Sequence, residues 1–143
     1  MSLVWPDSTE GIDWRALSEL YRVAPLAHKE PEHLRTTFAN SMYKRFVFDG
    51  DRLVAAGRVL ADGVDVAYIC DVALLPDYQG MGLGKRMVAE LLELSRGHKK
   101  VILYAVPGKE GFYARLGFRR MTTAMAIFED QAAAAERGYL QRD

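Results

Sequence analysis

Apolar and polar residues follow two different periods along the chain, and the change of period predicts where helices give way to strands. Near the N-terminus, apolar positions recur three or four residues apart, which is typical of helices that bury one face. This spacing predicts helices over Asp13–Val23 and Pro31–Asn40. Proline is tolerated in a first helical turn, so Pro31 is compatible with the start of the second helix. A short strand is expected ahead of both at Leu3–Trp5.

From residue 43 the pattern changes to strands separated by tight turns. The dipeptides Asp49-Gly50 and Asp62-Gly63 are strong hairpin signals, because glycine readily adopts the positive φ that such turns require. They divide the region into three predicted strands, which are Tyr43–Phe48, Arg52–Ala61 and Val64–Leu75. The prediction is a three-stranded antiparallel meander whose last strand ends at Pro76.

The second half of the chain alternates helices and strands. A helix is expected to begin at Leu83, with Gly97 in the left-handed position that follows a helix. The next predicted elements are a buried strand, a short helix and an alternating strand, over Val101–Ala105, Pro107–Leu116 and Met121–Phe128. The run Ala132–Ala135 favours a terminal helical turn or a frayed tail. The order β-α-α-β-β-β-α-β-α-β predicts an α/β fold with a mixed sheet. The strand-helix-strand unit from Val64 to Ala105 is expected to be parallel.

Composition indicates one ordinary folded domain. The chain has 143 residues, half of them hydrophobic and 27% charged, so we expect a single domain over residues 1–143. The 19 basic and 19 acidic residues cancel, which argues against a dedicated nucleic-acid or membrane-surface binder. The single cysteine, Cys70, excludes an internal disulfide. With no apolar signal segment or membrane span in the sequence, we expect a cytoplasmic protein.

The chemically informative segment follows the strand that ends at Leu75. It reads Gln79-Gly80-Met81-Gly82-Leu83-Gly84-Lys85. Its alternate glycines allow a ligand to approach the backbone, and the unpaired N–H groups at a helix N-terminus suit a phosphate. A Walker loop would need glycine in place of Gln79 and serine or threonine in place of Arg86, and a dinucleotide fingerprint would need glycine in place of Lys85. The alternative is a plain tight turn, for which one glycine suffices.

Two segments resemble motifs of one superfamily. The run Asp71–Lys85 resembles the acyl-CoA-binding motif Q/R-x-x-G-x-G/A of the GNAT N-acetyltransferases, and Gly111–Phe118 resembles their F/Y-Y-x-x-x-G-F segment. The predicted element order is also that of the GNAT fold. The resemblance extends from Tyr43 to Phe128. Ala67–Leu75 is further similar to plant-type serotonin N-acetyltransferases and their bacterial relatives.

The resemblance implies that acetyl-CoA is the cosubstrate and that its acetyl group passes directly to a primary amine. The glycine motif is expected to bind the CoA pyrophosphate, and the strand edge to pair with the pantetheine arm. The Val72 N–H would polarise the thioester carbonyl. The expected cofactor-binding residues are Val72, Leu74, Gln79, Gly80, Met81, Gly82, Leu83, Gly84 and Lys85. Val106 departs from the family pattern, because many members carry asparagine there.

Two residues are candidates for catalytic proton transfer. The resemblance gives Tyr113 the protonation of the leaving thiolate; the alternative is a tyrosine packed against the sheet. Asp71 is the candidate base, because a carboxylate in an apolar strand is costly to bury unpaired. The alternative is a carboxylate that accepts hydrogen bonds from the backbone or an arginine. Strict alternation places Asp71 opposite to Tyr68 and Cys70, unless a β-bulge reverses it.

The acceptor is expected between the helices of Asp13–Asn40, the strand Tyr68–Val72 and the start of the last strand. The helical region carries aromatic and acidic side chains that suit a small cationic amine, at Tyr21, His28, Glu30, Glu32 and His33. The alternatives are a protein lysine or N-terminal acetyltransferase, a noncatalytic acyl-CoA sensor and a structural protein. No histidine shows metal-ligand spacing, so no metal is expected. A homodimer is compatible with the sequence.

Overall fold

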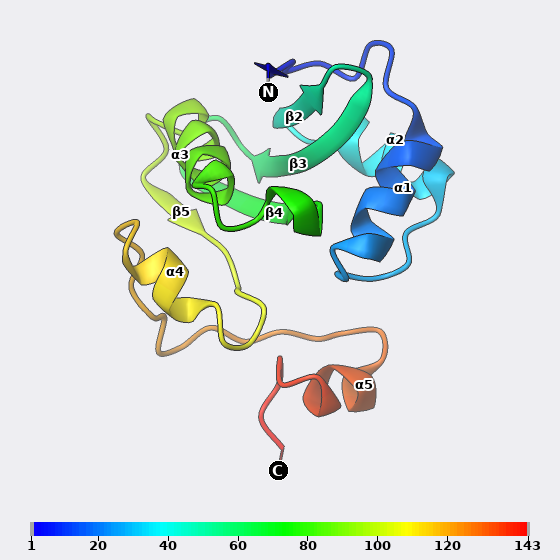
Figure 1. The fold of residues 1–143 in the computed structure, drawn as a ribbon. Helices are drawn as coiled ribbons and strands as arrows, with labels where there is room; N and C mark the ends of the chain where they lie inside the picture. The colour runs from blue at the N-terminus through cyan, green and yellow to red at the C-terminus, as the bar shows by residue number, and fades with distance from the viewer. Residues whose placement is uncertain (1, 143) are drawn as a thin grey trace. The chain divides into compact units, whose positions relative to one another are not determined.

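The computed structural model describes residues 2–142, drawn in Figure 1. These residues divide into two compact units, of which the first ends at Leu103 and the second begins at Tyr104. The single domain over residues 1–143 stays a prediction. No helix within residues 2–142 is long and apolar enough to cross a membrane.

A five-stranded mixed sheet forms the first unit. Its strands, in spatial order, are β1 (Leu3–Val4), β2 (Tyr43–Asp49), β3 (Arg52–Ala61), β4 (Val66–Leu74) and β5 (Lys100–Ile102). Neighbours from β1 to β4 are antiparallel, and β4 pairs with β5 in parallel. The meander and the parallel unit are therefore confirmed. β5 is shorter than predicted and ends at Ile102.

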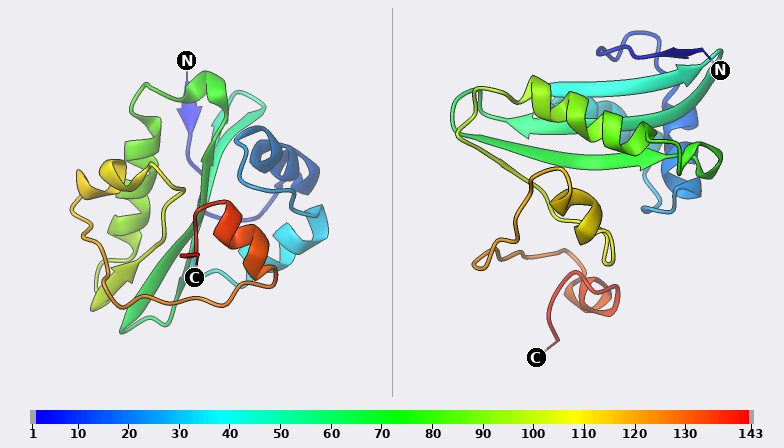
Figure 2. Two further views of the ribbon diagram at one scale, coloured as in Figure 1. Left: turned by 90° about the horizontal axis from the view of Figure 1, so that it is seen from below. Right: turned by 60° about the vertical axis from the view of Figure 1, so that its left-hand side comes forward.

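Helices cover both faces of this sheet (Figure 2). The helices α1 (Trp14–Val23) and α2 (Pro31–Ala39) lie on one face, and α3 (Leu83–Leu94) lies on the other. Asp13 caps α1 as its side chain accepts hydrogen bonds from two backbone N–H groups of the first turn. The apolar faces predicted from the sequence are buried, with Leu17, Phe38, Met87 and Leu91 completely shielded from solvent.

A β-bulge interrupts β4 at Asp71. The register shifts between Ala56 and Arg58 on β3, so that Asp71 and Val72 together lie opposite Gly57. Asp71 has a φ of 55°, in the left-handed region that non-glycine residues seldom adopt. The extra residue in β4 changes which face of the sheet each following side chain meets.

The bulge directs Asp71 and Val72 to opposite faces. A Cβ atom at Gly57 would lie 2.9 Å from a methyl group of Leu91 on α3 and 3.3 Å from a methyl group of Val72. Val72 therefore faces α3, and glycine at position 57 lets that helix pack closely. Asp71 instead bonds to Arg58, which lies opposite Cys70 and shares its face. The sequence allowed for this reversal, and the structure contains it.

The second unit contains two short helices, α4 (Glu110–Ala114) and α5 (Gln131–Glu136). The helix α4 is predicted, although it is shorter than expected, and for Ala132–Ala135 the structure contains the helix rather than the frayed tail. The predicted strand Met121–Phe128 is wrong, because the segment pairs with no strand of the described chain. Its Met125 and Ile127 side chains are 96% and 94% exposed. Alternation gives a segment strand propensity, but a strand forms only where a partner takes up its backbone groups.

Candidate active site

The glycine motif connects β4 to α3 through a short 3₁₀ turn, η1 (Pro76–Tyr78). Gly80 and Gly82 have φ values of 80° and 83°, which suit glycine. Gly82 is the N-cap of α3, and its carbonyl accepts the first helical hydrogen bond, 3.1 Å from the Arg86 N–H. Within residues 2–142, the backbone N–H groups of residues 80–85 donate to no protein acceptor.

This loop fits an anionic ligand. The first turn of α3 carries no acidic side chain, and the positive end of the helix dipole lies there. A Cβ atom built on Gly80 or Gly82 meets no protein atom within 4 Å, so the protein's own packing leaves room beside both glycines. The residues present fit the pyrophosphate of CoA, which the N–H groups from Gly80 to Lys85 would hold.

The edge of β4 that faces β5 is only partly paired. The two strands pair from Val66 to Tyr68, so the rest of β4 has no strand partner on that edge within the described chain. The Leu75 N–H donates to a carbonyl of β3, and main-chain groups of alternate residues point to opposite edges of a strand. The main-chain groups of Leu74 and Val72 are thereby directed away from β3, as the sequence analysis expects for strand-like pairing with a ligand.

One of these edge groups already has a protein partner. The side-chain amide of Gln79 donates a hydrogen bond of 3.2 Å to the Leu74 carbonyl oxygen. The bond ties the start of the glycine motif to the end of β4. It also places Gln79, which the sequence predicts to bind the cofactor, against the strand edge.

Asp71 lies between two cations. Its Oδ2 accepts a hydrogen bond of 2.8 Å from Arg58 Nε, and its Oδ1 lies 3.4 Å from Lys29 Nζ. The side chains of Arg58 and Asp71 are 13% and 18% exposed, and that of Lys29 is 27% exposed. The carboxylate therefore has the arginine partner that the sequence analysis gave as the alternative to a catalytic role. The role of Asp71 as a base stays a prediction.

Two further contacts hold this group in place. The hydroxyl of Tyr21, on α1, donates a hydrogen bond of 2.6 Å to the main-chain carbonyl of Asp71. Arg58 also donates from Nη1 to the Ser41 hydroxyl at 3.2 Å and lies over the ring of Phe38. Burial raises the pKa of Tyr21 well above its ordinary value, so this phenol is a donor at every physiological pH.

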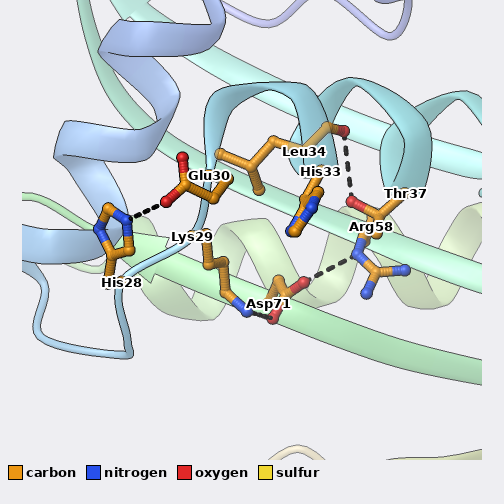
Figure 3. A pocket seen from close by; sticks show the side chains of 8 residues that line it. All are labelled: His28, Lys29, Glu30, His33, Leu34, Thr37, Arg58 and Asp71. Carbon is orange, nitrogen blue, oxygen red and sulfur yellow. Dashed lines mark hydrogen bonds and ion pairs between the residues drawn. The ribbon is translucent and has the colours of Figure 1, made fainter.

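A pocket of about 410 Å³ opens beside Asp71 (Figure 3). Its walls come from the α1–α2 connection, from α2 and from β3 and β4, through the side chains of His28, Lys29, Glu30, His33, Leu34, Thr37, Arg58 and Asp71. The volume lies in the range of small-molecule sites. Three of the residues expected to recognise the acceptor line it, which are His28, Glu30 and His33.

Two other expected acceptor residues, Tyr21 and Glu32, do not line the pocket. The Tyr21 ring is completely buried in the core, and Glu32 pairs with Arg35 on the exposed side of α2. Lys29 and Arg58 are functional-site residues that were not predicted from the sequence. An arginine between the buried residues of a central strand is a signal that it has a partner inside the protein, and Arg58 follows this pattern.

Tyr113 lies on α4, in the second unit. Its ring makes edge-on contacts with Phe112 and Phe118, at centroid distances of 5.0 and 5.9 Å. Burial raises the pKa of its phenol above the ordinary value of 10.0. The group is therefore protonated at neutral pH, as a proton donor must be. Its catalytic role stays a prediction.

Cys70 is partly buried, and desolvation raises the pKa of its thiol. A raised thiol pKa leaves little thiolate at neutral pH, which does not favour a nucleophile. Within residues 2–142, no three histidine, cysteine or acidic side chains gather as a metal site would require.

The sequence matches one protein-family model over most of its length. The model described as "Acetyltransferase (GNAT) family" matches residues 11–118. The chain belongs to the GNAT family. The match contains all of the predicted cofactor-binding residues, both catalytic candidates and the pocket.

Named relatives agree with this assignment to the GNAT family. The chain is 34% identical over 119 residues to a protein of Oryza sativa subsp. japonica named serotonin N-acetyltransferase 2, chloroplastic, a match that covers 78% of this chain and 58% of the relative. It is 32% identical over 113 residues to a protein of Prochlorococcus marinus named uncharacterized N-acetyltransferase ycf52-like, a match that covers 75% of this chain and 63% of the relative. The chain thus spans about 60% of the length of these relatives. The expected similarity to plant-type serotonin N-acetyltransferases and bacterial relatives is confirmed.

Solved structures share the same fold. A protein of unknown function from meticillin-resistant Staphylococcus aureus, SA2161, superimposes with a TM-score of 0.80 at 22% sequence identity, over 90% of this GNAT chain and 99% of the other. The predicted mixed α/β fold is confirmed.

Proposed function

We propose that this GNAT protein is an N-acetyltransferase that moves the acetyl group of acetyl-CoA directly to the primary amine of a small molecule. The observation that supports this most is the run of backbone N–H groups from Gly80 to Lys85 at the N-terminus of α3, which donate to no acceptor among residues 2–142. Acetyl-CoA is the cosubstrate general to the family. It supplies a pyrophosphate for this loop and an activated acetyl group for transfer.

The bulge in β4 gives Val72 its proposed role. Because its N–H is directed to the unpaired edge of β4, it can donate to the oxygen that becomes negative when an amine attacks a thioester. Donors held by the backbone need no rearrangement as that charge develops. Tyr21 fixes the neighbouring carbonyl of Asp71 and so helps to hold this donor in place.

The proposed transfer requires two proton movements. Asp71 would hold the incoming ammonium group and accept one proton from it, passing the proton to solvent. The amine nitrogen then bonds to the thioester carbon as the carbon–sulfur bond breaks. Tyr113 would protonate the leaving thiolate and recover its proton from the second one that the nitrogen loses. The products are an N-acetylated amine and CoA with a free thiol.

The pocket beside Asp71 supports a small-molecule acceptor. Its volume of about 410 Å³ suits a compact ligand, and the relative with the name serotonin N-acetyltransferase points to the same class of acceptor. A protein lysine or N-terminal amine is the main alternative acceptor. A noncatalytic acyl-CoA sensor would keep the glycine loop and lack turnover. A cytoplasmic location stays a prediction.

A free-thiol assay tests the proposal. The purified protein is incubated with acetyl-CoA and, separately, with small amines and with peptides that carry an N-terminal or lysine amine. We expect CoA release that depends on a small amine and a product with one acetyl group by mass spectrometry. Release only with peptides would favour the protein acetyltransferase. CoA binding without release would favour the sensor.

A further inference from the structure

The pocket beside Asp71 offers a ligand more hydrogen-bond donors than acceptors. Both oxygens of Asp71 have cationic partners, Arg58 and Lys29, and Glu30 pairs with His28 at 2.9 Å through Oε1, which leaves Glu30 Oε2 as the one carboxylate oxygen of the pocket without a partner in the described chain. This differs from the prediction made from the sequence, in which the acidic side chains are free to bind a cationic amine.

Several donors on the pocket wall remain available. Lys29 uses one of its three N–H groups on Asp71. Arg58 uses Nε and Nη1 and leaves Nη2 without a hydrogen bond to the described chain. The ring nitrogens of His33 likewise make no hydrogen bond within residues 2–142. The pocket is therefore suited to a ligand that carries an acidic group as well as an amine.

The two cations do not hold Asp71 equally. The Arg58 contact is a direct hydrogen bond of 2.8 Å from a side chain that is 13% exposed. The Lys29 contact is 3.4 Å long, and its side chain is more exposed, at 27%. Lysine is a flexible point charge with three rotatable donors, whereas the arginine fork is fixed by Ser41 and Phe38. Lys29 is thus the partner that a ligand can displace.

We propose that the acceptor is a primary amine that also carries a carboxylate or phosphate, and that it binds by inserting its two charged groups between Lys29 and Asp71. The ammonium group replaces Lys29 at Asp71 Oδ1, next to Val72. The acidic group takes the released Lys29, with His33 as a neighbouring donor. This inference rests on the proposed N-acetyltransferase function and specifies its substrate class.

Insertion of both charged groups leaves every charge in the pocket with a partner of opposite sign. A plain cationic amine that displaced Lys29 from Asp71 would leave the ammonium of Lys29 without its anion, close to a second positive charge. An amine with its own acidic group supplies that anion, so each charge keeps a partner. The position of Lys29 over the Tyr21 ring, 5.7 Å from its centroid, keeps the lysine at the pocket wall during the exchange.

Matched pairs of amines test the inference. β-Alanine is compared with ethylamine, and glucosamine 6-phosphate with glucosamine, so that each pair differs in one acidic group and the two pairs distinguish a carboxylate from a phosphate. The readout is kcat/KM for CoA release at saturating acetyl-CoA. We expect kcat/KM for at least one acidic amine to exceed that for the matched amine without an acidic group by about tenfold or more, the typical contribution of a charge-assisted hydrogen bond.

The variant Lys29→Glu tests the recognition of the acidic group. It should abolish or reverse the preference for the acidic amine, and Lys29→Met should reduce it. Lys99→Glu, which makes the same charge change at an exposed position outside the pocket, should keep the wild-type ratio. Thermal melting establishes that each variant is folded. Equal kcat/KM within both pairs, or an unchanged ratio in Lys29→Glu, would overturn the inference.

A binding measurement separates this inference from the proposed function. Calorimetry with the same four amines, in the presence of CoA, should show tighter binding of the favoured acidic amine, and Lys29→Glu should remove the difference. If no amine or peptide is acetylated, the proposed function is wrong. The calorimetric comparison of acidic and non-acidic amines then still tests whether the pocket prefers a ligand with an acidic group. If amines are acetylated without any acidic preference, only the inference fails.

Discussion

The hydroxyl of Tyr21 donates a hydrogen bond of 2.6 Å to the main-chain carbonyl oxygen of Asp71, fifty positions further along the chain. The bond joins α1 to the bulge of β4, where Asp71 adopts a left-handed φ of 55°. The partly buried carbonyl gains a donor, and the buried phenol of Tyr21 gains the acceptor that it needs. The helix layer thereby holds β4 in place directly before Val72, whose N–H is the proposed oxyanion donor.

Tyr21→Phe removes this hydrogen bond and keeps the ring. We expect a loss of about 1–2 kcal/mol in the free energy of unfolding, because a partly buried carbonyl loses its donor. Turnover should fall by about tenfold, less than when an oxyanion donor is removed outright, while the Kd for acetyl-CoA stays the same. Urea unfolding measures the free energy of unfolding, and steady-state kinetics measure turnover. Tyr43→Phe, on β2, is the control, and equal turnover in the two variants would contradict the role of the bond.

Arg58→Met breaks the less exposed of the two ion pairs of Asp71. The carboxylate then remains largely buried with only the looser Lys29 partner, which we expect to cost about 3 kcal/mol in the free energy of unfolding. Lys29→Met retains the Arg58 contact and should cost less than about 1 kcal/mol. Chemical denaturation of the two variants gives the comparison. Equal losses would show that the two cations hold Asp71 alike.

Gly82→Ala places a methyl group in the open space beside the glycine loop. The substitution is strained because the φ of Gly82 is 83°, and it should cost about 1–2 kcal/mol of stability. Gly11→Ala is a matched control, since Gly11 has a φ of 75° and similarly open surroundings far along the chain. We expect similar melting temperatures for both variants, but a weaker acetyl-CoA affinity only for Gly82→Ala. Unchanged affinity would exclude the loop as the pyrophosphate site.

Tyr113→Phe removes the proposed acid. Turnover should fall by about a hundredfold or more, which is the usual contribution of general acid catalysis, with acetyl-CoA affinity retained. Burial raises the pKa of Tyr113 above 10.0, so the acid contribution is present at neutral pH and is lost as the pH rises through that raised pKa. A pH–rate profile should therefore show an alkaline decline in the wild type that is missing in Tyr113→Phe. Superimposable profiles would leave Tyr113 with a packing role.

The sequence predicted the elements whose signals are local. Each hairpin follows from an Asp-Gly dipeptide, and the start of α3 follows from the glycines before it. The prediction of a strand over Met121–Phe128 was wrong, because strand formation is not a local property. The alternation of its residues is local, but strand pairing requires the edge of another strand, which the segment itself does not encode.

The backbone elements of the candidate site were predicted more completely than the contacts between its side chains. The conformations of the glycine loop and of the edge of β4 depend on residues that are adjacent in the sequence, so a sequence motif is enough to predict them. The contacts of Asp71 with Arg58, Lys29 and Tyr21 join four different elements or connections. Only the assembled fold brings these groups together, and our proposal of an acceptor with an acidic group is based on their contacts.

Isothermal titration of the wild-type protein with acetyl-CoA tests the central claim most directly. The claim predicts one binding site per chain with a Kd between about 1 μM and 1 mM, the usual range for enzyme substrates. The heat should decrease strongly in Gly82→Ala and persist in Gly11→Ala. A folded wild-type protein that gives no binding heat at two temperatures would contradict the account.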